Sequence, residues 1–425
     1  MASVCRSVTE LSASPEPGCN EGVKSHTPCR GWNARWQWLQ LNLPAWAISL
    51  WASSGQRRAP SGGCNANIMD CPVRRPCVSA YTSVVRLSPR SRRLKSRRPA
   101  AKPHVLYVSY NSAFDPLVES QVVSYLHGLH QQHGLEFRLI TFEPTETLAR
   151  VGRAGTEAMR VRLRTVGITW SWLPYHKRPS LPATLWDIVA GTLKLVREIR
   201  RRLPLFIHAR SHVPAAMAML AGRLTGVPFL FDFRGTFADA YVDFGHWSPL
   251  SIKYRVTKLV EPVLLQAAHQ IVVLTERFRG MLASGDGMRP MDVGRVTVIP
   301  CCVAIQEYPA ETAPEPAFIF CFAGSLGNYY LLNEMLDFVA AARCLDSGVR
   351  LLVLNRNEHE LIRLEADKRG LLEICEIKAV EHHAIPAELA RASAGLAFLR
   401  PTFSMQAASP VSYTHLRAHE TGRNL

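Results

Sequence analysis

HVLYVSYNSAFDPLVESQ, residues 104–121, decides the fold, because a short apolar run is followed at once by polar residues and a helix start. The first six residues, HVLYVS, follow Pro103 and precede polar residues, as is typical of a buried strand. Asp115 can cap a helix, and Pro116 suits its first turn. Apolar side chains then recur at helical spacing, at Val118, Val122, Leu126 and Leu129. The stretch therefore predicts a strand, a polar loop and a helix.

A second strand and polar loop lie in the middle of the chain. Residues 228–231, PFLF, read as a buried strand, and Asp232, Arg234 and Asp239 follow it. His212 stands in a third such place, at the end of the HARSH string. In an open parallel sheet, ligands bind beyond the carboxyl ends of the strands. We therefore expect these polar residues to face one crevice.

Strands and helices alternate from residue 103 onward, which argues for parallel sheets covered on both faces. Residues 307–316, EYPAETAPEP, have no apolar period and are typical of a linker, placed here at 303–316. The first set of strands and helices (103–302) includes predicted strands at 137–142, 205–208, 270–274 and 296–299. It also includes a helix that begins at Pro214 and ends at a C-cap, Gly226. A further helix is predicted over 185–202, with these residues on one face: Leu185, Ile188, Val189, Val196 and Ile199. The second (317–410) predicts strands at 318–322, 350–354 and 395–399 and helices at 331–342 and 358–369. The sequence predicts an α/β protein with two Rossmann-like lobes.

The positive charge is concentrated before the first lobe. The formal net charge is +16, but residues 1–102 hold 16 Lys and Arg against 4 Asp and Glu, so the rest is nearly neutral. The apolar residues of this segment show no sustained helix or strand period, so we expect a disordered basic extension. It is either part of the natural protein or a non-native addition. The densest basic block of the extension, residues 86–98, could bind anionic lipid or nucleic acid through charge alone. The alternative is that it has no specific partner. We expect no specific nucleic-acid partner. The Trp-bearing run at 39–52 is too short to span a bilayer but suits an interface.

Eight strings occur in this order in the chain: YNSAFDPLVESQVVSYLHGL, ITFEP, WLPYHKRPS, IHARSHVPAAMAML, FDFRGTFADAYVDFGHW, IVVLTERF, VIPCCV and FAGSLGNYY. Together they resemble family 4 glycosyltransferases of the GT-B class, in particular bacterial enzymes that build lipid-linked or surface polysaccharides. The resemblance covers residues 103–410. It implies an acceptor-side first lobe, a donor-binding second lobe, and transfer of a sugar from a nucleotide-sugar to a glycan or lipid-linked acceptor with retention of anomeric configuration. The departing phosphate would help to deprotonate the acceptor.

The chemistry of that transfer selects candidate residues. A diphosphate leaving group needs hydrogen-bond donors and positive charge, which Arg234 and the turn at Gly324, Ser325 and Gly327 can supply. His212 can orient the donor or take a proton, and Asp232 and Asp239 can accept sugar hydroxyls. Structural alternatives are a salt bridge from Arg234 to Asp232 or Asp239, a hydrogen-bonded His212, and aspartates that cap helices. The remaining candidates are a loop near the base at His382 and Ile385, the donor-side Ser409 and Pro410, and the acceptor-side Asn111, Asp115, Ser120 and Gln121.

The resemblance implies no cofactor, since the nucleotide-sugar is a substrate. No metal is implied either, because no D-x-D triplet occurs, and His382 and His383 have no third ligand nearby. With no transmembrane segment and cysteines that suggest a reducing compartment, we expect a cytoplasmic protein, with peripheral contact at the inner membrane as an option.

The chain also departs from the family pattern. Asn328, Tyr329 and Tyr330 stand where many relatives have Arg and Lys, and Ala240 and Ala304 each replace an acidic residue. Residues 411–425 match no part of the family and read as a non-native tail, so we expect a truncated second lobe that lacks strands, with impaired activity. Two alternatives stay open. One is a non-catalytic nucleotide-sugar or lipid-binding fragment, and the other is another Rossmann-type enzyme, which the missing G-x-G-x-x-G after the first strand disfavours.

Overall fold

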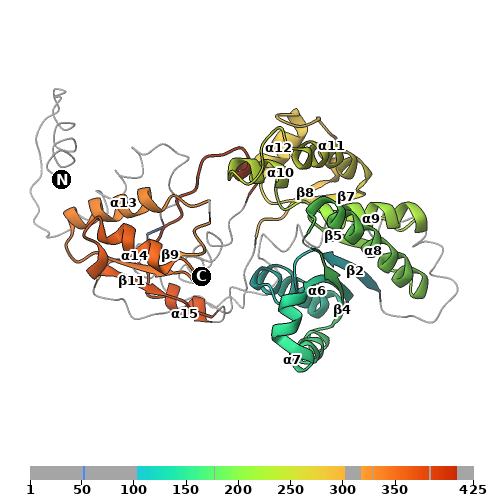
Figure 1. Ribbon diagram of the computed structural model, residues 1–425, viewed down its shortest axis with the longest axis horizontal. Helices are drawn as coiled ribbons and strands as arrows, with labels where there is room; N and C mark the ends of the chain where they lie inside the picture. The colour runs from blue at the N-terminus through green and yellow to red at the C-terminus, as the bar shows by residue number, and fades with distance from the viewer. Residues whose placement is uncertain are drawn as a thin grey trace, which may run out of the picture. The chain divides into compact units, whose positions relative to one another are not determined.

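The computed structural model describes residues 51–52, 103–176, 178–301, 317–327, 329–381 and 384–408 (Figure 1). The predicted linker, the tail from residue 411 and all of the basic extension except residues 51–52 lie outside this part. Among the described helices, none has the length and hydropathy needed to cross a bilayer.

The first lobe is built on a seven-stranded sheet in which every pair of neighbours is parallel, in the order β4-β3-β2-β5-β6-β7-β8. The register pairs Leu106 with Ile207 and Ile207 with Phe229, so apolar side chains of neighbouring strands stack in rows. The strands are β2 (His104–Ser109), β3 (Glu136–Pro144), β4 (Ile168–Tyr175), β5 (Ile207–Arg210), β6 (Phe229–Asp232), β7 (Gln270–Val273) and β8 (Val296–Val298).

Helices cover both faces of this sheet. One face is packed by α5 (Pro116–Val118), η3 (Glu119–Val123), α6 (Ser124–His133) and α7 (Thr145–Thr165). The other is packed by α8 (Ser180–Arg201), α9 (His212–Thr225), α11 (Ile252–Ala267) and α12 (Glu276–Ser284). Figure 1 shows α8 and α9 side by side on that second face. The helix α10 (Phe237–Asp243) and the 3-10 turn η4 (Val293–Arg295) complete the lobe.

Local sequence signals explain several boundaries. The Asp115 side chain accepts from the Leu117 amide and caps α5, with Pro116 in the first turn, as predicted. The helix then passes through a π-helical turn, η3, which the sequence did not predict. Gly226 ends α9 in the left-handed region at a φ of 74°, also as predicted.

Two features of the first lobe differ from the prediction. The helix α7 and the strand β4 were missed, although Ile168, Trp170 and Trp172 alternate with polar residues in β4 and the apolar residues of α7 gather on one side. In the predicted helix over 185–202, Val196 and Ile199 are buried but Leu185 and Val189 are exposed. Apolar spacing gives the helix but does not say whether its apolar side is covered.

The second lobe has a five-stranded sheet in the order β1-β12-β9-β10-β11. The strands β9, β10, β11 and β12 pair in parallel, and β1, from within the predicted extension, pairs antiparallel with β12. Strands β9 and β10 were predicted, β11 was missed, and the strand predicted at 395–399 is reduced to the two residues of β12. The strands are β1 (Trp51–Ala52), β9 (Ile319–Ala323), β10 (Arg350–Leu354), β11 (Cys375–Lys378) and β12 (Ala394–Gly395).

The helices of this lobe are α13 (Leu332–Leu345), α14 (His359–Asp367) and α15 (Ile385–Leu389), with a 3-10 turn η6 (Leu372–Ile374). The first two follow the predicted ranges closely. A last 3-10 turn, η8 (Ser404–Ala407), packs on the first lobe, where the Ser404 amide donates to Asp243 at 3.0 Å.

Candidate functional site

Two neighbouring strands, β5 and β6, end in charged residues that meet at the carboxyl edge of the seven-stranded sheet. Arg210 ends β5, Asp232 ends β6, and Arg234 follows two residues later. The Gln121 side-chain oxygen accepts from Arg210 Nη2 at 2.7 Å and from Arg234 Nη2 at 2.6 Å. We call Gln121, His208, Arg210, Asp232 and Arg234 the arginine cluster. It brings together predicted residues from the first helix and from the loop after β6, which are more than a hundred residues apart.

The arginine cluster is buried and carries an excess of positive charge. Asp232 lies 3.5 Å from Arg234 Nη1 and 3.9 Å from Arg210 Nη1. Burial alone would raise the pKa of Asp232, but the Arg234 guanidinium and its neighbours outweigh this and hold the pKa far below its usual value. Burial lowers the pKa of His208, which is therefore neutral at pH 7. Two guanidinium groups thus face one carboxylate.

One nitrogen of the arginine cluster is left for a further acceptor. Arg210 is only 7% exposed, and its Nη1 makes no hydrogen bond to any described residue. Buried polar atoms of this kind are uncommon, and an oxygen of a bound anion would satisfy this one. The salt bridge of Arg234 is made with Asp232 and not with Asp239. The structural alternative for Arg234 is therefore present, but the pairing leaves one guanidinium charge uncompensated.

A second group of charged side chains, linked by hydrogen bonds, begins at His212, the first residue of α9. His212 Nε2 lies 3.0 Å from Glu261 Oε2, and Lys258 donates to both Glu261 at 3.0 Å and Asp239 at 2.9 Å. Tyr254 also donates to Asp239, at 3.1 Å. Burial alone would raise the pKa of Glu261, but its bonds to His212 and Lys258 lower it below its usual value. His212 and Asp239 are thus joined through two residues that the sequence did not single out.

The residue between the arginine cluster and His212 has an unusual backbone. Ser211 has a φ of 72°, the one positive φ outside glycine among the described residues. Side chains other than glycine adopt this conformation at a cost, and such residues concentrate at binding and catalytic sites. The strain turns the chain sharply from β5 into α9, so that Arg210 and His212 belong to different clusters. Asp239 lies inside α10, and neither it nor Asp232 caps a helix.

The predicted acceptor-side residues divide into two groups. Asn111 donates to Asp115 at 3.2 Å in an exposed position, and Ser120 donates to the Pro116 carbonyl, so both hold the start of the helix. Gln121 is buried in the arginine cluster. The loop before them is fixed by Glu143, which is fully buried and accepts from the Ala113 amide at 2.8 Å and from Ser112.

Another buried carboxylate, Asp187 of α8, lies at the same edge. It accepts from the Tyr110 hydroxyl at 2.7 Å and from the His176 amide at 3.1 Å, and its other oxygen lies 2.5 Å from His176 Nδ1. Burial, followed by the bond to Asp187, raises the pKa of Tyr110. Neither Glu143 nor Asp187 was predicted, because a single acidic residue in an apolar segment gives no sequence signal of its partners.

In the second lobe, the predicted donor turn lies between β9 and α13, as expected, but a carboxylate occupies it. Ser325 Oγ donates to Glu358 Oε1 at 2.8 Å, and the Gly327 amide lies 3.4 Å from the same oxygen. Asn355 Nδ2 donates to Glu358 Oε2 at 2.6 Å and to the Gly324 carbonyl at 2.9 Å. Two of the groups predicted to bind phosphate are therefore held by an internal anion.

Local hydrogen bonds keep that anion ionised. Burial alone would raise the pKa of Glu358, but its bonds to Asn355, Ser325 and Gly327 lower it below its usual value. The remaining donor-side candidates are less informative. The prediction that Ile385 lies in a loop is wrong. Ile385 begins α15 and packs on the core of the second lobe. His382, Ser409 and Pro410 lie outside the described residues.

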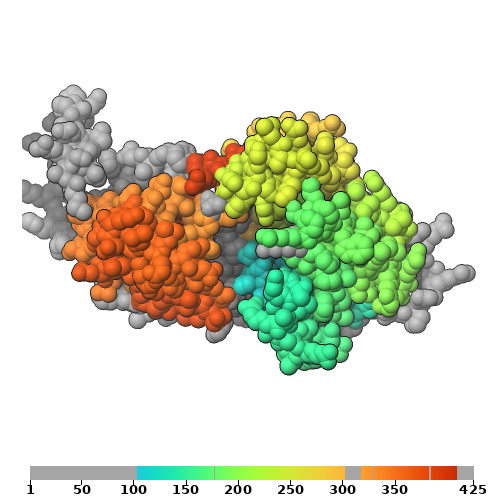
Figure 2. Space-filling model, in the orientation of Figure 1, coloured from blue at the N-terminus to red at the C-terminus, as the bar shows by residue number. Residues whose placement is uncertain are grey.

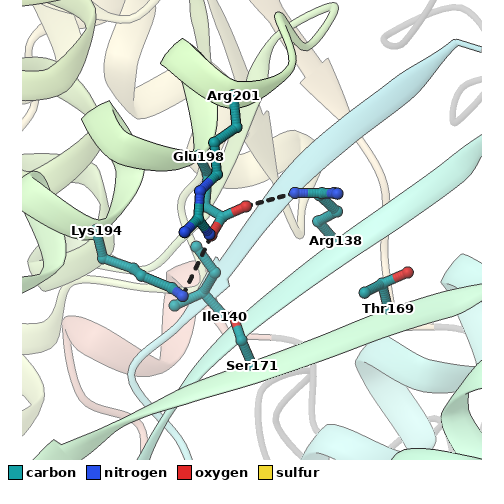
Figure 3. Close-up of a pocket in the computed structure, with 7 residues that line it drawn as sticks. All are labelled: Arg138, Ile140, Thr169, Ser171, Lys194, Glu198 and Arg201. Atoms are coloured by element: carbon teal, nitrogen blue, oxygen red, sulfur yellow. Dashed lines mark hydrogen bonds and ion pairs between the residues drawn. The ribbon is translucent and has the colours of Figure 1, made fainter.

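Figure 3 shows a different hollow, of about 240 Å³, beside the last turns of α8. Glu198 lies within it, close to Arg138 of β3 and 3.2 Å and 3.3 Å from Lys194 and Arg201 of its own helix. None of the predicted site residues lines it. Among the described residues, no three His, Cys, Asp or Glu side chains are grouped as metal ligands would be.

Comparison with known proteins identifies the first lobe. The glycosyl transferase 4-like domain family matches residues 118–302. No curated protein sequence matches the chain significantly.

Solved structures give distant likenesses, and the three described here have TM-scores below 0.5. A glycosyltransferase from Rickettsia africae ESF-5 is 14% identical over 69% of this chain and 72% of its own, with a TM-score of 0.49. The N-terminal domain of a trehalose-6-phosphate phosphatase from Candida albicans is 12% identical over 70% and 77%, with a TM-score of 0.48. A sucrose-phosphate synthase from Thermosynechococcus elongatus is 12% identical over 68% and 74%, with a TM-score of 0.47.

The assignment rests on the matched family together with the architecture described above. Two α/β lobes, each built on a parallel sheet, are the architecture that the sequence predicted. Residues 118–302 belong to the glycosyl transferase 4-like domain family, so the first lobe of this chain is a glycosyltransferase domain.

Proposed function

We propose that this glycosyltransferase moves a sugar from a nucleotide-sugar donor to a glycan or lipid-linked acceptor in surface polysaccharide synthesis, with retention of anomeric configuration. The observation that carries the proposal is the arginine cluster. It lies at the carboxyl edge of a parallel sheet, where ligands bind, and it combines an uncompensated positive charge with an unsatisfied Arg210 Nη1. A departing nucleoside diphosphate is an anion of the kind that such a cluster stabilises.

The remaining residues have supporting roles in this proposal. The departing phosphate accepts the acceptor's proton, so no carboxylate nucleophile, metal ion or cofactor is needed. His212 orients the reacting groups, because its Nε2 is held by Glu261 while its Nδ1 has no hydrogen-bond partner among the described residues. Asp239 and the exposed Asn111 and Asp115 offer acceptors for sugar hydroxyls.

Release of nucleoside diphosphate from a panel of nucleotide-sugars tests the proposal. Arg234→Gln removes the charge and should abolish release, whereas Arg234→Lys keeps the charge and should retain part of it. Thermal unfolding of both variants shows whether the fold survives. Release by Arg234→Gln at the wild-type rate would contradict the role of the arginine cluster. Nuclear magnetic resonance of the product's anomeric proton tests retention separately.

A second candidate function is binding of a nucleotide-sugar without transfer. The observation that favours it is Glu358, which occupies the donor turn, together with the lack of any Arg or Lys from residue 324 to residue 330. Calorimetric binding of a nucleotide-sugar without release of nucleoside diphosphate, in the presence of lipid and glycan acceptors, would support this alternative. Release would decide for transfer.

We further propose that the protein works in the cytoplasm and touches the inner membrane peripherally, where lipid-linked acceptors are found. The basic block and most of the Trp-bearing run that suggested such contact lie outside the described residues. The first lobe has its own candidate surface.

A further inference from the structure

The outer face of α8 exposes large apolar side chains that no described residue of the lobe covers. Leu185, Trp186 and Leu193 are 62%, 63% and 63% exposed, and Val189 lies between them at 51%. These positions repeat at helical spacing and form one stripe over the first half of the helix. A soluble surface scatters single apolar residues, so a stripe that includes a tryptophan indicates a binding surface.

Large apolar side chains are also exposed on the two helices that follow along the same side of the sheet. Helix α9 packs against both α8 and α11, and Figure 2 shows α8 and α9 open to view on one face of the lobe. Leu224 of α9 is 71% exposed, and Ile252 and Leu259 of α11 are 71% and 73% exposed. We call the outer side of α8, α9 and α11 the helical face.

The charges on the helical face are all of one sign. The three helices contain only three acidic residues, Asp187, Glu198 and Glu261, and none is more than 6% exposed. The exposed charges are basic, and those of α8 lie in its last turns, at Arg197, Arg200 and Arg201. A surface that is apolar in one part and basic in the next matches the boundary between anionic headgroups and acyl chains.

We propose that the helical face docks on a membrane surface that contains anionic lipid. A second copy of the chain is a poorer occupant, because self-association through this face would bring like charges together. The hollow beside α8 adds to the argument. Arg138, Lys194 and Arg201 surround the single carboxylate of Glu198 there, so the hollow beside the basic end of α8 also has a net positive charge (Figure 3).

Docking in this way would bring the lipid surface near the candidate site. Helix α8 follows β4 and α9 follows β5, and α11 leads directly into β7, so the first turns of all three helices lie towards the carboxyl edge of the sheet. The apolar half of α8, from Leu185 to Leu193, is therefore its end nearer to the arginine cluster. A lipid-linked acceptor would reach that edge without leaving the membrane. The docking surface does not depend on the catalytic proposal and can be tested without turnover.

Co-sedimentation of the full chain with vesicles tests the proposal. We expect binding to phosphatidylcholine vesicles that contain phosphatidylglycerol, weakening as salt rises, and little binding to phosphatidylcholine alone. Leu193→Glu should lower the partition coefficient about tenfold or more, since it replaces a leucine that would contact the acyl chains by a charge that anionic lipid repels. Arg197→Gln and Arg200→Gln should each lower it about fivefold, equivalent to about 1 kcal/mol per charge near an anionic surface.

Leu364→Glu is the matched control, because Leu364 is 55% exposed on α14 of the second lobe. It makes the same substitution off the helical face and should bind vesicles as the wild type does. Circular dichroism and thermal unfolding show that each variant is folded. The proposal is overturned if Leu193→Glu binds as tightly as the wild type, or if the wild type fails to bind the anionic vesicles. A wild-type dimer that Leu193→Glu converts to monomer, without vesicle binding, would also overturn it and assign the face to a second copy.

Discussion

Replacing Glu358 by Gln tests whether the donor turn is blocked by its own chain. Glu358 holds Ser325 Oγ at 2.8 Å and Asn355 Nδ2 at 2.6 Å, so a phosphate oxygen bound at the same groups would have to displace it. If the side chain stayed nearby, its charge would repel the phosphate. Glutamine has the same shape but no charge, and it makes weaker hydrogen bonds to the two donors.

The size of the effect follows from these two contributions. A hydrogen bond to a charged acceptor is worth about 1 kcal/mol more than a neutral one. Two unit charges 5 Å apart repel by about 1 kcal/mol when the medium is close to water, which is the lower limit for a partly buried carboxylate such as Glu358. Because the carboxylate can swing into solvent, we count only one of these terms. Glu358→Gln should therefore bind nucleoside diphosphate about fivefold more tightly than the wild type.

Isothermal titration with nucleoside diphosphates, at constant ionic strength, measures the change. Glu360→Gln is the control, because Glu360 lies on the same helix but pairs with Arg363 at the surface and should leave affinity unchanged. The pKa of Glu358 is lowered, so it stays ionised from pH 8 to pH 5 and the difference between wild type and variant should persist over that range. Equal affinity would refute competition at the turn. Weaker binding by the variant would mean that Glu358 itself binds the donor.

Three further predictions concern the stability of the fold. Lys258→Met leaves the buried carboxylates of Asp239 and Glu261 without their shared cation. It should lower the free energy of unfolding by about 2 kcal/mol in a urea titration at pH 7. An unchanged unfolding midpoint would show that the hydrogen-bonded side chains between His212 and Asp239 do not stabilise the fold together. Burial, and then the charges of two arginines, lowers the pKa of His104 to about 4 in the folded protein. As the pH falls, the histidine is therefore protonated first in the unfolded chain, and the free energy of unfolding should decrease between pH 6.5 and pH 4. In His104→Phe that part of the pH dependence should vanish. Gly226→Ala forces a Cβ into the left-handed cap of α9 and should cost about 1 kcal/mol, measured as a fall in Tm, whereas a rise would show that the cap relaxes freely.

Local sequence signals predicted most of the strands and helices of this molecule. They did not predict the long-range contacts of the candidate site. The cap at Asp115, the glycine that ends α9 and the strands β2, β6 and β10 follow from residues within a few positions of each other. The partners of the candidate residues do not. Gln121 meets Arg234 across 113 positions, and Glu358 reaches the donor turn across 33.

Burial was the other quantity that periodicity could not supply. The spacing of Leu185 and Val189 correctly predicts a helix, but it cannot say that this side of α8 is exposed in the part of the chain that the structure describes. The strand predicted at 205–208 ends at His208 and leaves Arg210 outside, and only the pairing of β5 with β6 brings these two residues to Asp232. Strain at Ser211 has no sequence signature at all, since serine is ordinary before a helix.

Transfer itself is the most direct test of the central claim. The full chain is incubated with single nucleotide-sugars and a bacterial lipid extract, and the sugar is followed by mass spectrometry and the released nucleoside diphosphate by chromatography. The account predicts that one donor yields equal amounts of nucleoside diphosphate and glycosylated acceptor, and that Arg234→Gln yields neither. No transfer from any donor by a protein that is folded and binds nucleoside diphosphate would contradict it.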